Sequence, residues 1–284
     1  MSWTTHGDAE RLAKLALAED GPCDVTTEVT AGLHARLAGQ IEFREAGVLA
    51  GREYADAVAR LAGCGPVEWR AAEGGHLAAG AVAGTFEGRA VDVLRAERPL
   101  LNLLQRASGI ASATREYAEA VAGTGCRVLH TRKTAPGLRA LDVAAVLAGG
   151  GHLHRVDLAT TVMVKDNHWQ ALARTGRSLA DALAAARERG VAACQVEVER
   201  MGQVEEACLA GADRLLVDNQ SPETLRAWAE RARTLRPGIE IEATGGITLA
   251  NVRAYAEAGA DFVSIGALTH SVRAADVALE VMPP

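Results

Sequence analysis

The second half of the chain alternates between short apolar runs and longer amphipathic segments. The apolar runs are nearly continuous and rich in β-branched and aliphatic residues, which is typical of strands covered on both faces, as in a parallel sheet. Between them, apolar residues recur at helical spacing, and Ser221 followed by Pro222 supplies a helix start. We therefore expect strands at residues 126–131, 161–166, 194–199, 214–219, 239–244 and 261–266, and helices at residues 178–190, 221–236 and 249–259.

A short internal repeat supports this alternation. The sequence AGAD occurs at residues 210–213 and again at 258–261, each time directly before an expected strand. Successive strand–helix units of similar size would produce such a repeat. Repeated units of this kind predict an α/β barrel, either complete or with a strand missing.

The first part of the chain follows a different pattern. Residues 8–20 have the apolar spacing of an amphipathic helix, whereas residues 37–51 and 81–97 predict strands with glycine turns. Residues 98–123 predict a long helix that joins the two halves. We therefore expect an N-terminal α+β domain over residues 1–112 and an α/β barrel domain over residues 113–270, with residues 271–284 packing back onto the first domain.

Composition and charge exclude several classes of protein. Of the 284 residues, 49% are apolar and 23% are charged, which is ordinary for a soluble globular protein. The formal net charge of −6 argues against nucleic acid as a partner, because phosphate backbones require a basic surface. No apolar run approaches the roughly 18–20 residues needed to cross a bilayer, and the N-terminus lacks the layout of a signal peptide. The five cysteines form no CxxC pair, so we expect neither a disulfide framework nor a zinc site, and a cytoplasmic location.

Lysine is scarce, and its positions are informative. Among 30 lysines and arginines, only Lys14, Lys133 and Lys165 are lysines. A chain that prefers arginine so strongly should keep lysine where arginine would not serve. Residues 120–141 also contain four cationic side chains and no acidic one, which favours an anion-binding segment over an ordinary solvated loop.

The polar residues that end the expected strands form three candidate groups. In an α/β barrel the carboxyl ends of the strands converge on one face, where functional residues gather. The cationic group is Arg132, Lys133, His154, Arg155 and Lys165; the acidic pair is Glu197 and Asp218; and the small loops suited to cradle a phosphate are Thr244-Gly245-Gly246 and Gly266-Ala267, with His270 a turn later.

These groups indicate one chemistry. Five cations in one pocket would repel one another unless an anionic ligand compensates them, and each charge-assisted contact to a carboxylate or phosphate contributes roughly 1.5–3 kcal/mol. The acidic pair could hold Mg²⁺, which typically takes one or two protein carboxylates together with substrate phosphates. We therefore expect a phosphorylated sugar that reacts with an acidic partner.

Three alternatives stay open from the residues alone. Lys165 at a strand end could form a Schiff base, as in barrel aldolases, because cationic neighbours favour the neutral amine. His152 and His154 could begin a metal site with Glu197 or Asp218 as further ligands, although Arg155 and Lys165 would repel a metal ion. A protein that binds the ligand without turnover is the third alternative. Borohydride trapping with a carbonyl substrate and metal analysis would distinguish the first two.

In order and spacing, the motifs resemble those of quinolinate phosphoribosyltransferase, the decarboxylating nicotinate-nucleotide pyrophosphorylase family. The motifs that carry the resemblance are LNLLQRASGIAS, TRKTAPGLR, GGGHLHRVDL, VMVKDNH, VEVE, LLVDN, EATGGITLANV and VSIGALTHS, and it extends from ALAEDGPCDVTT to the end of the chain. The resemblance implies a type II phosphoribosyltransferase fold, with an N-terminal sandwich-like domain and an incomplete, seven-stranded α/β barrel. It also implies a Mg²⁺-dependent reaction of quinolinate with 5-phosphoribosyl 1-pyrophosphate that yields nicotinate mononucleotide, pyrophosphate and carbon dioxide in NAD biosynthesis.

The resemblance further implies residue roles. The enzyme would form a homodimer with shared active sites, in which the neighbouring subunit donates Arg106. Such dimers could assemble further into a hexamer. Lys165, Glu197 and Asp218 would be the catalytic residues. Arg132, His154, Arg155 and Lys165 would hold the two quinolinate carboxylates, with Lys133 and Arg139 nearby; Glu197 and Asp218 would face the ribose and the magnesium-bound pyrophosphate; and Thr244, Gly245, Gly246, Gly266 and His270 would bind the 5-phosphate.

Four positions depart from the family pattern without removing a charge. They are Cys23, which would be strained if its backbone were left-handed, His130, Leu153 and Thr244. The alternative within the fold is the molybdenum-transport-associated homologue, a group that tends to lack the lysine of KDNH, which is Lys165 here.

Overall fold

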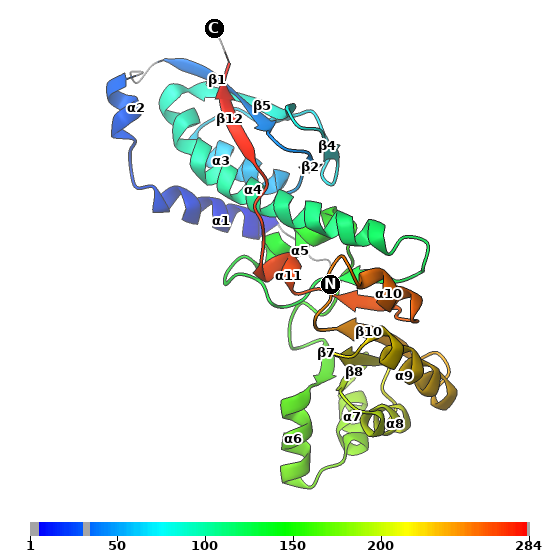
Figure 1. Cartoon of the computed structure of the whole chain (residues 1–284). Coiled ribbons are helices and arrows are strands. Elements are labelled where there is room, and N and C mark those ends of the chain that lie inside the picture. The colour runs from blue at the N-terminus through cyan, green and yellow to red at the C-terminus, as the bar shows by residue number, and fades with distance from the viewer. Residues whose placement is uncertain (1–5, 31–34, 283–284) are drawn as a thin grey trace. The chain divides into compact units, whose positions relative to one another are not determined.

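The computed structural model describes residues 6–30 and 35–282, and it divides the chain into two compact units (Figure 1). The first unit comprises the described residues of Met1–Arg115, Thr134–Gly150 and Ala267–Pro284, and the second comprises Glu116–Lys133 and Gly151–Gly266. These units divide the chain at points other than 112 and 270, so the domain limits expected from the sequence stay a prediction. Residues 1–5, 31–34 and 283–284 of the expected domains lie outside the described residues.

The first unit contains a four-stranded sheet in the order β12-β1-β5-β3. All its neighbouring strands are antiparallel, and β12 from the C-terminal segment pairs with β1 through Gly39–Val281 to Phe43–Val277. β2 and β4 form a separate, two-stranded antiparallel sheet. The strands are β1 (Arg36–Phe43), β2 (Gly47–Val48), β3 (Glu68–Trp69), β4 (His76–Leu77), β5 (Ala81–Arg89) and β12 (Val277–Val281).

The helices of the first unit include one that the sequence placed only in part. Residues 90–97 were expected to continue a strand, but α4 already begins at Ala90, and this expectation is wrong. The reason is the spacing of Val93, Ala96 and Leu100, which are all buried and recur every three to four residues, as on one face of a helix. The helices are α1 (His6–Glu19), α2 (Val25–Thr30), α3 (Arg52–Ala62), α4 (Ala90–Ala120), α5 (Arg139–Ala148) and α11 (Ala267–His270), and α4 continues into the second unit at Glu116.

The second unit is built on a six-stranded parallel sheet in the order β6-β11-β10-β9-β8-β7. An isolated parallel bridge between Leu129 and His152 adds a seventh chain segment next to β6. The two edges formed by β7 and this bridge are not joined, which agrees with the expected incomplete barrel, although the seventh position is a bridge rather than a full strand. The strands are β6 (Arg127–Leu129), β7 (Thr161–Val164), β8 (Ala193–Val198), β9 (Arg214–Asp218), β10 (Glu240–Thr244) and β11 (Phe262–Ser264).

Helices follow these strands, as the alternation predicted. Ser178 and Ser221 cap α7 and α9 by accepting the backbone N–H of Asp181 and Thr224, and Pro222 begins α9. The helices are α6 (Asp166–Thr175), α7 (Leu179–Glu188), α8 (Met201–Leu209), α9 (Pro222–Leu235) and α10 (Val252–Glu257). The α/β class and the parallel sheet are therefore confirmed.

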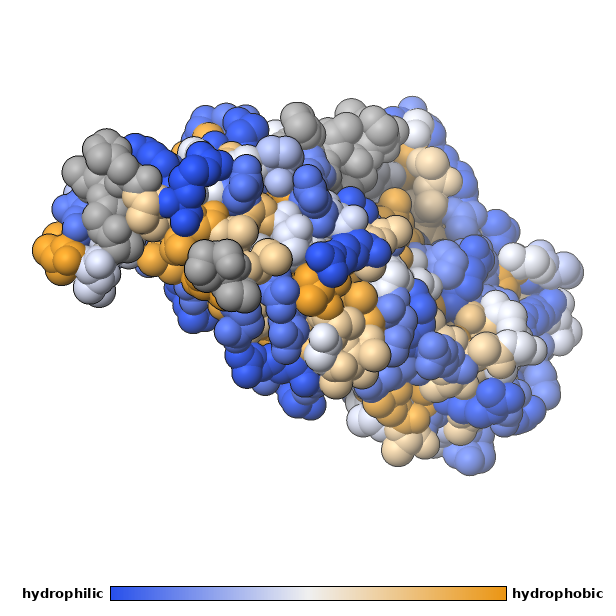
Figure 2. Space-filling view, turned by 90° about the horizontal axis from the view of Figure 1, so that it is seen from above, coloured by the Kyte–Doolittle hydropathy of each residue, from blue (hydrophilic) through white to orange (hydrophobic). Residues whose placement is uncertain are grey.

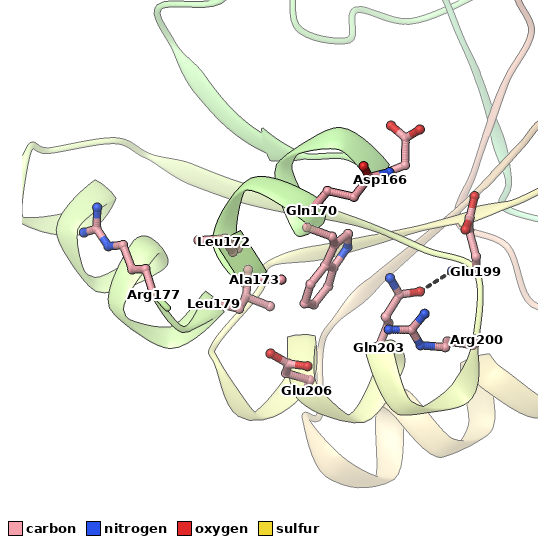
Figure 3. Close-up of a pocket in the computed structure, with 11 residues that line it drawn as sticks. Asp166, Gln170, Leu172, Ala173, Arg177, Leu179, Glu199, Arg200, Gln203 and Glu206 are labelled. Atoms are coloured by element: carbon pink, nitrogen blue, oxygen red, sulfur yellow. Dashed lines mark hydrogen bonds between the residues drawn. The ribbon is translucent and has the colours of Figure 1, made fainter. Parts of the chain in front are cut away.

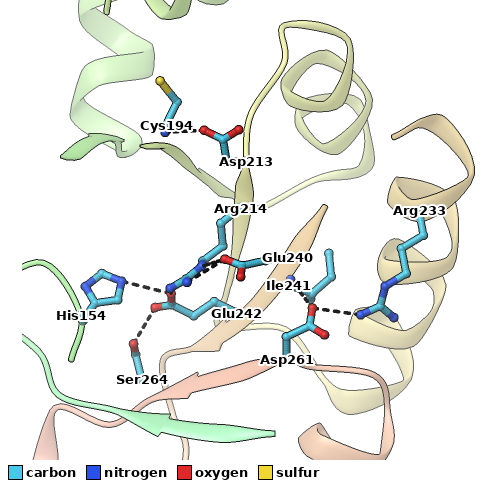
Figure 4. Close-up of polar contacts among 10 residues, drawn as sticks. All are labelled: His154, Cys194, Asp213, Arg214, Arg233, Glu240, Ile241, Glu242, Asp261 and Ser264. Carbon is cyan, nitrogen blue, oxygen red and sulfur yellow. Dashed lines mark hydrogen bonds and ion pairs between the residues drawn. The ribbon is translucent and has the colours of Figure 1, made fainter. Parts of the chain in front are cut away.

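The AGAD repeat has a structural cause (Figure 4). Asp213 accepts the backbone N–H of Cys194 at 2.8 Å and pairs with Arg187. Asp261 accepts the backbone N–H of Ile241 at 2.7 Å and pairs with Arg233. In each unit of the repeat, the aspartate thus fixes the start of the neighbouring strand and also binds the helix that leads into that strand.

Two further features bear on expectations from the sequence. Cys23 is exposed, and among the described residues other than glycine only Asn219 has a positive φ, so the expected strain at Cys23 is absent. Within the described residues, no helix is long and apolar enough to cross a membrane. Hydrophilic side chains cover much of the face seen in Figure 2, with smaller apolar patches between them.

Candidate active site

The candidate residues of the second unit gather at the carboxyl edge of its parallel sheet. Lys165 directly follows β7, Glu197 is the penultimate residue of β8, and Asp218 and Thr244 end β9 and β10. The register aligns Thr244 with Asp218. Because the strands are parallel, these side chains belong to one edge, as the sequence predicted.

Lys165 and Glu197 form a direct ion pair between neighbouring strands. Glu197 is buried, while the lysine side chain is partly exposed. Lys165 also precedes α6, where its backbone N–H donates to Nδ1 of His168 at 3.0 Å and fixes the strand-to-helix turn. The sequence places Lys165 in the cationic group and Glu197 in the acidic pair, whereas in the structure the two residues form an ion pair.

Asp218 lies half-buried beside this pair. Burial raises the pKa of its carboxyl, and the charge of Glu197 raises it further, while a hydrogen bond from Asn219 and the charge of Lys165 lower it. The Asn219 amide donates to Asp218 at 2.7 Å, and the backbone of Asn219 is left-handed, with φ 52°. The two carboxylates therefore interact electrostatically with each other, and both interact with Lys165.

The loop after β10 is shaped by two glycines. Gly245 and Gly246 have φ values of 80° and 64°, which favour glycine. A Cβ on Gly245 would also overlap the side chain of Asn219. The backbone N–H of Asn219 donates to the Thr244 carbonyl at 2.9 Å. Asn251 closes the loop by donating to the Gly246 carbonyl at 3.0 Å and accepting the N–H of Thr248 at 2.7 Å. The loop after β9 thus packs against the loop after β10.

Arg132 and Arg155 interact with each other near the end of β6. Burial lowers the pKa of Arg155, and the charge of Arg132 lowers it further. Nε of Arg132 is buried and has no hydrogen-bond partner among the described residues. Lys133, by contrast, is exposed. An anion bound between these two partly buried arginines would compensate their repulsion.

His154 is held by a buried charged network that the sequence did not predict (Figure 4). Its Nε2 lies 3.1 Å from Oε2 of Glu242, which also accepts from Arg214 at 3.0 Å, while Oε1 accepts from Ser264 at 2.5 Å. Despite full burial, these donors lower the pKa of Glu242. Although the sequence groups His154 with cationic residues, its contact in the structure is with the acidic Glu242.

A pocket of about 430 Å³ is lined mainly by residues of α6 and α8 (Figure 3). Trp169 and Gln170 of α6 and Gln203 of α8 line it, and the Trp169 indole N–H donates to the carbonyl of Glu197 at 2.9 Å. None of the sequence-predicted site residues lines this pocket. Its tryptophan acts on the site by fixing the backbone of β8.

Three predicted site residues and Gly266 are placed differently. Gly266 ends the second unit after β11, whereas Arg106, Arg139 and His270 belong to the first unit. In that unit Arg106 donates to both carboxylate oxygens of the buried Asp142 at 2.8 Å and to the Thr269 carbonyl at 3.1 Å. Arg139 begins α5, and His270 is exposed at the end of α11, 2.7 Å from the Ser271 hydroxyl.

The described residues contain no cluster of three or more His, Cys, Asp or Glu side chains suited to a metal ion. A metal site built from His152 and His154 is therefore not supported there, since His154 is bonded to Glu242 and His152 is exposed. The pair of Glu197 and Asp218 could contribute to a cation that is held mainly by a ligand.

Family models identify the chain. The N-terminal domain model of quinolinate phosphoribosyl transferase matches residues 24–108, and the C-terminal domain model matches residues 110–280. The chain belongs to the quinolinate phosphoribosyltransferase family. The resemblance inferred from the motifs is thereby confirmed over nearly the whole sequence, and the chain is an enzyme of the phosphoribosyltransferase class.

Curated relatives agree with this assignment. The chain is 38% identical to the probable nicotinate-nucleotide pyrophosphorylase [carboxylating] of Methanothermobacter thermautotrophicus, over 95% of this chain and 97% of that protein. It is 37% identical to the nicotinate-nucleotide pyrophosphorylase [carboxylating] of Mycobacterium leprae, over 91% of each protein. These names favour the phosphoribosyltransferase over the transport-associated homologue and the Schiff-base lyase.

Solved structures share the fold over the full length. The nicotinate-nucleotide pyrophosphorylase from Francisella tularensis superposes with a TM-score of 0.90 at 29% identity, covering 98% of each chain. NadC from Streptococcus pyogenes superposes with a TM-score of 0.87 at 34% identity, covering 99% of each chain. The type II phosphoribosyltransferase fold is therefore confirmed.

Proposed function

We propose that this enzyme transfers the phosphoribosyl group of 5-phosphoribosyl 1-pyrophosphate to quinolinate and releases carbon dioxide. The products would be nicotinate mononucleotide and pyrophosphate, in the synthesis of NAD. The observation that carries the proposal is the family match over both domains, together with Lys165, Glu197 and Asp218 at one edge of the sheet.

The dicarboxylate would bind at the cationic group. Arg132 and Arg155 interact closely enough that the charge of one lowers the pKa of the other. A carboxylate bound between them would remove this repulsion and satisfy the buried Nε of Arg132. His154 and Lys165 would complete the binding of the two carboxylates, with Lys133 and Arg139 contributing positive charge nearby.

The ribose and pyrophosphate would bind at the acidic pair. Glu197 and Asp218 would face the ribose hydroxyls, and Lys165 would link them to the bound quinolinate. The raised pKa of Asp218 supports a cation at this position, because a cation would stabilise its ionised form. Mg²⁺ fits these two oxygen donors provided that substrate phosphates supply most of its ligands, and when bound it would stabilise charge on the leaving pyrophosphate.

The 5-phosphate would bind at the loop of Thr244, Gly245 and Gly246, with Gly266 and His270. Gly245 and Gly246 have left-handed backbones, and backbone N–H groups in such a loop would donate to the phosphate oxygens. This arrangement separates the two ends of the sugar phosphate. The reactive carbon would lie near the acidic pair, and the phosphate near the loop after β10.

The chemistry follows from where charge develops. The pyridine nitrogen attacks the anomeric carbon of the ribose as the bond to pyrophosphate breaks, so negative charge grows on the leaving group and the ring becomes cationic. The carboxylate next to the cationic nitrogen then leaves as carbon dioxide, and the electron pair left on the ring carbon takes up a proton. A monocarboxylate would leave part of the cationic group unpaired, which favours selection of the dicarboxylate.

The assembly expected for this enzyme is a cytoplasmic homodimer, possible as part of a hexamer, in which Arg106 enters the site of the neighbouring subunit. The hydrogen bonds of Arg106 to Asp142 and Thr269 use Nε and Nη2. Nη1, on the remaining corner of the guanidinium, would be the group offered to a ligand. No nucleic acid or membrane takes part in this proposal.

One assay tests the proposal. Purified enzyme is incubated with 5-phosphoribosyl 1-pyrophosphate, with and without Mg²⁺, and with either quinolinate or nicotinate, while nicotinate mononucleotide and pyrophosphate are measured. We expect product with quinolinate and Mg²⁺ and strongly reduced product with nicotinate. Equal turnover of the two acids would contradict the role of the cationic group, and absence of turnover with quinolinate would overturn the proposed reaction.

A further inference from the structure

The interior of the barrel contains charges that its packing does not require. Such interiors are usually filled by branched apolar side chains. Here Glu242 is 1% exposed and lies in the centre of β10, with Arg214 of β9 and Ser264 of β11 on the adjacent strands (Figure 4). Well-packed apolar residues in place of a buried ion pair are often neutral or stabilising. We therefore expect the charged network around Glu242 to have a role other than stabilising the fold.

The donors around Glu242 show what it does. Arg214 and Ser264 donate to Oε2 and Oε1, and His154 contacts Oε2 through Nε2. A carboxylate only accepts hydrogen bonds, so the proton of the imidazole at this contact lies on Nε2. Arg214 is fixed in turn by Glu240, at 2.8 Å from its Nε, and by stacking 3.9 Å above the Phe262 ring. Glu242 is thus held by Arg214 and Ser264 as well as by its contact with His154.

We propose that Glu242 is a positioning residue for the aromatic acid substrate, because it fixes the ring orientation and the proton of His154. This inference rests on the proposed function, in which His154 binds a carboxylate of quinolinate. With Nε2 committed to Glu242, the ring presents its other nitrogen in one defined orientation. The side chain of His154 is only 7% exposed and its ring meets the His130 ring edge-on at 6.4 Å, so the ring is packed against His130 while Glu242 fixes its Nε2.

The expected consequence is selective. Loss of the contact should weaken quinolinate binding and leave 5-phosphoribosyl 1-pyrophosphate binding nearly unchanged, because Glu242 does not touch Glu197, Asp218 or the loop after β10 through any hydrogen bond found among the described residues. A residue that only stabilised the barrel would weaken both ligands together. The ratio of the two affinities is therefore the measurement that separates a positioning role from a structural one.

Glu242→Gln tests the charge, and Glu242→Asp keeps the charge for Arg214 while shortening the reach to His154. Isothermal titration of each ligand separately should show a rise in the quinolinate Kd on the order of tenfold, the equivalent of one charge-assisted hydrogen bond. Glu240→Gln is the matched control, since Glu240 contacts the same arginine but is 43% exposed and does not touch His154. It should leave the quinolinate Kd unchanged.

Two further measurements complete the test. In a His154→Ala background, Glu242→Gln should weaken quinolinate binding no further, whereas additive losses would overturn the proposal. In the unaltered protein, nitrogen NMR should find the His154 proton on Nε2, and a neutral ring protonated only on Nδ1 would overturn it without any variant. If the unaltered protein binds no quinolinate, the proposed function fails; if it binds quinolinate and Glu242→Gln binds equally well, only this inference fails.

Discussion

At the scale of single residues, Asp218 combines partial burial with a neighbouring negative charge. Burial and Glu197 both raise the pKa of its carboxyl. The folded protein therefore binds this proton more tightly than the unfolded chain does, for which the ordinary aspartate value is about 3.9. Stability contributed by this group falls as the pH rises from the ordinary value through the raised one, and above that interval the ionised carboxylate destabilises the fold.

Asp218→Asn should accordingly stabilise the protein at neutral pH while it removes activity. The expected gain in free energy of unfolding is on the order of 1 kcal/mol or less, because water screens the half-exposed side chain. Urea unfolding should show this gain at about pH 8 and lose it at about pH 4. Asp157→Asn is the control in which the pKa of the replaced carboxyl is shifted in the opposite direction, because the backbone N–H of Ala159 lowers the pKa of Asp157. A gain for Asp218→Asn that did not change with pH would contradict the electrostatic origin.

Some site residues were predictable one by one, and others were not. The placement of Lys165, Glu197 and Asp218 at one edge of the sheet was predictable, because the carboxyl ends of parallel strands lie on one face. Glu242 and Ser264 were missed because an alternating pattern identifies two faces of a strand but not the one that points into the barrel. Acidic residues are also usually exposed, so Glu240 and Glu242 look alike in the sequence although only Glu242 is fully buried.

At the scale of elements, the loop after β10 depends on one close approach. A side chain on Gly245 would meet a left-handed backbone and overlap Asn219, which is tied to Asp218 by its side chain and to Thr244 by its backbone. Gly246 has a positive φ as well, but a Cβ there would meet nothing within 4 Å. The two glycines therefore offer a matched comparison.

Gly245→Ala should destabilise the protein by about 1–3 kcal/mol, from backbone strain and the displaced asparagine. Gly246→Ala should cost only the strain, about 1 kcal/mol. Chemical denaturation measures both, and Gly245→Ala should cost less in an Asn219→Ala background, where the overlap is gone. Equal costs for the two glycine variants would show that the contact with Asn219 does not shape the loop.

The elements themselves were largely predictable. All six expected barrel strands are present with ends within two residues of the prediction, because continuous apolar runs and glycine stops are local signals. The start of α4 was not, since residues 81–97 contain β-branched residues on both sides of the boundary. Burial of Val93 and Ala96 on one helical face decides it, and burial depends on tertiary packing that local preference does not encode.

At the scale of the whole molecule, Arg106 connects folding with assembly. It pairs with the fully buried Asp142, which also accepts the backbone N–H of Ala135 at 3.3 Å. Removing one partner of a buried ion pair typically costs about 3–5 kcal/mol. Arg106→Ala would therefore confound a test of a shared active site with loss of stability. Arg106→Lys keeps a cation beside Asp142 but loses the planar fork that binds an anion at a second corner.

Mixing Arg106→Lys with Lys165→Ala should then restore activity that neither variant has alone. If each site takes Arg106 from the partner, a mixed dimer contains one site with both residues intact, and random mixing should recover about a quarter of the activity of the unaltered enzyme. Lys165→Ala mixed with Asp218→Asn is the control, because both residues belong to one barrel edge and no exchange of subunits can unite them in a site. Recovery is measured as nicotinate mononucleotide formed after subunit exchange. If the first mixture stays as inactive as the control, while exchange is verified by a tag on one variant, Arg106 acts within its own chain and the shared site is wrong.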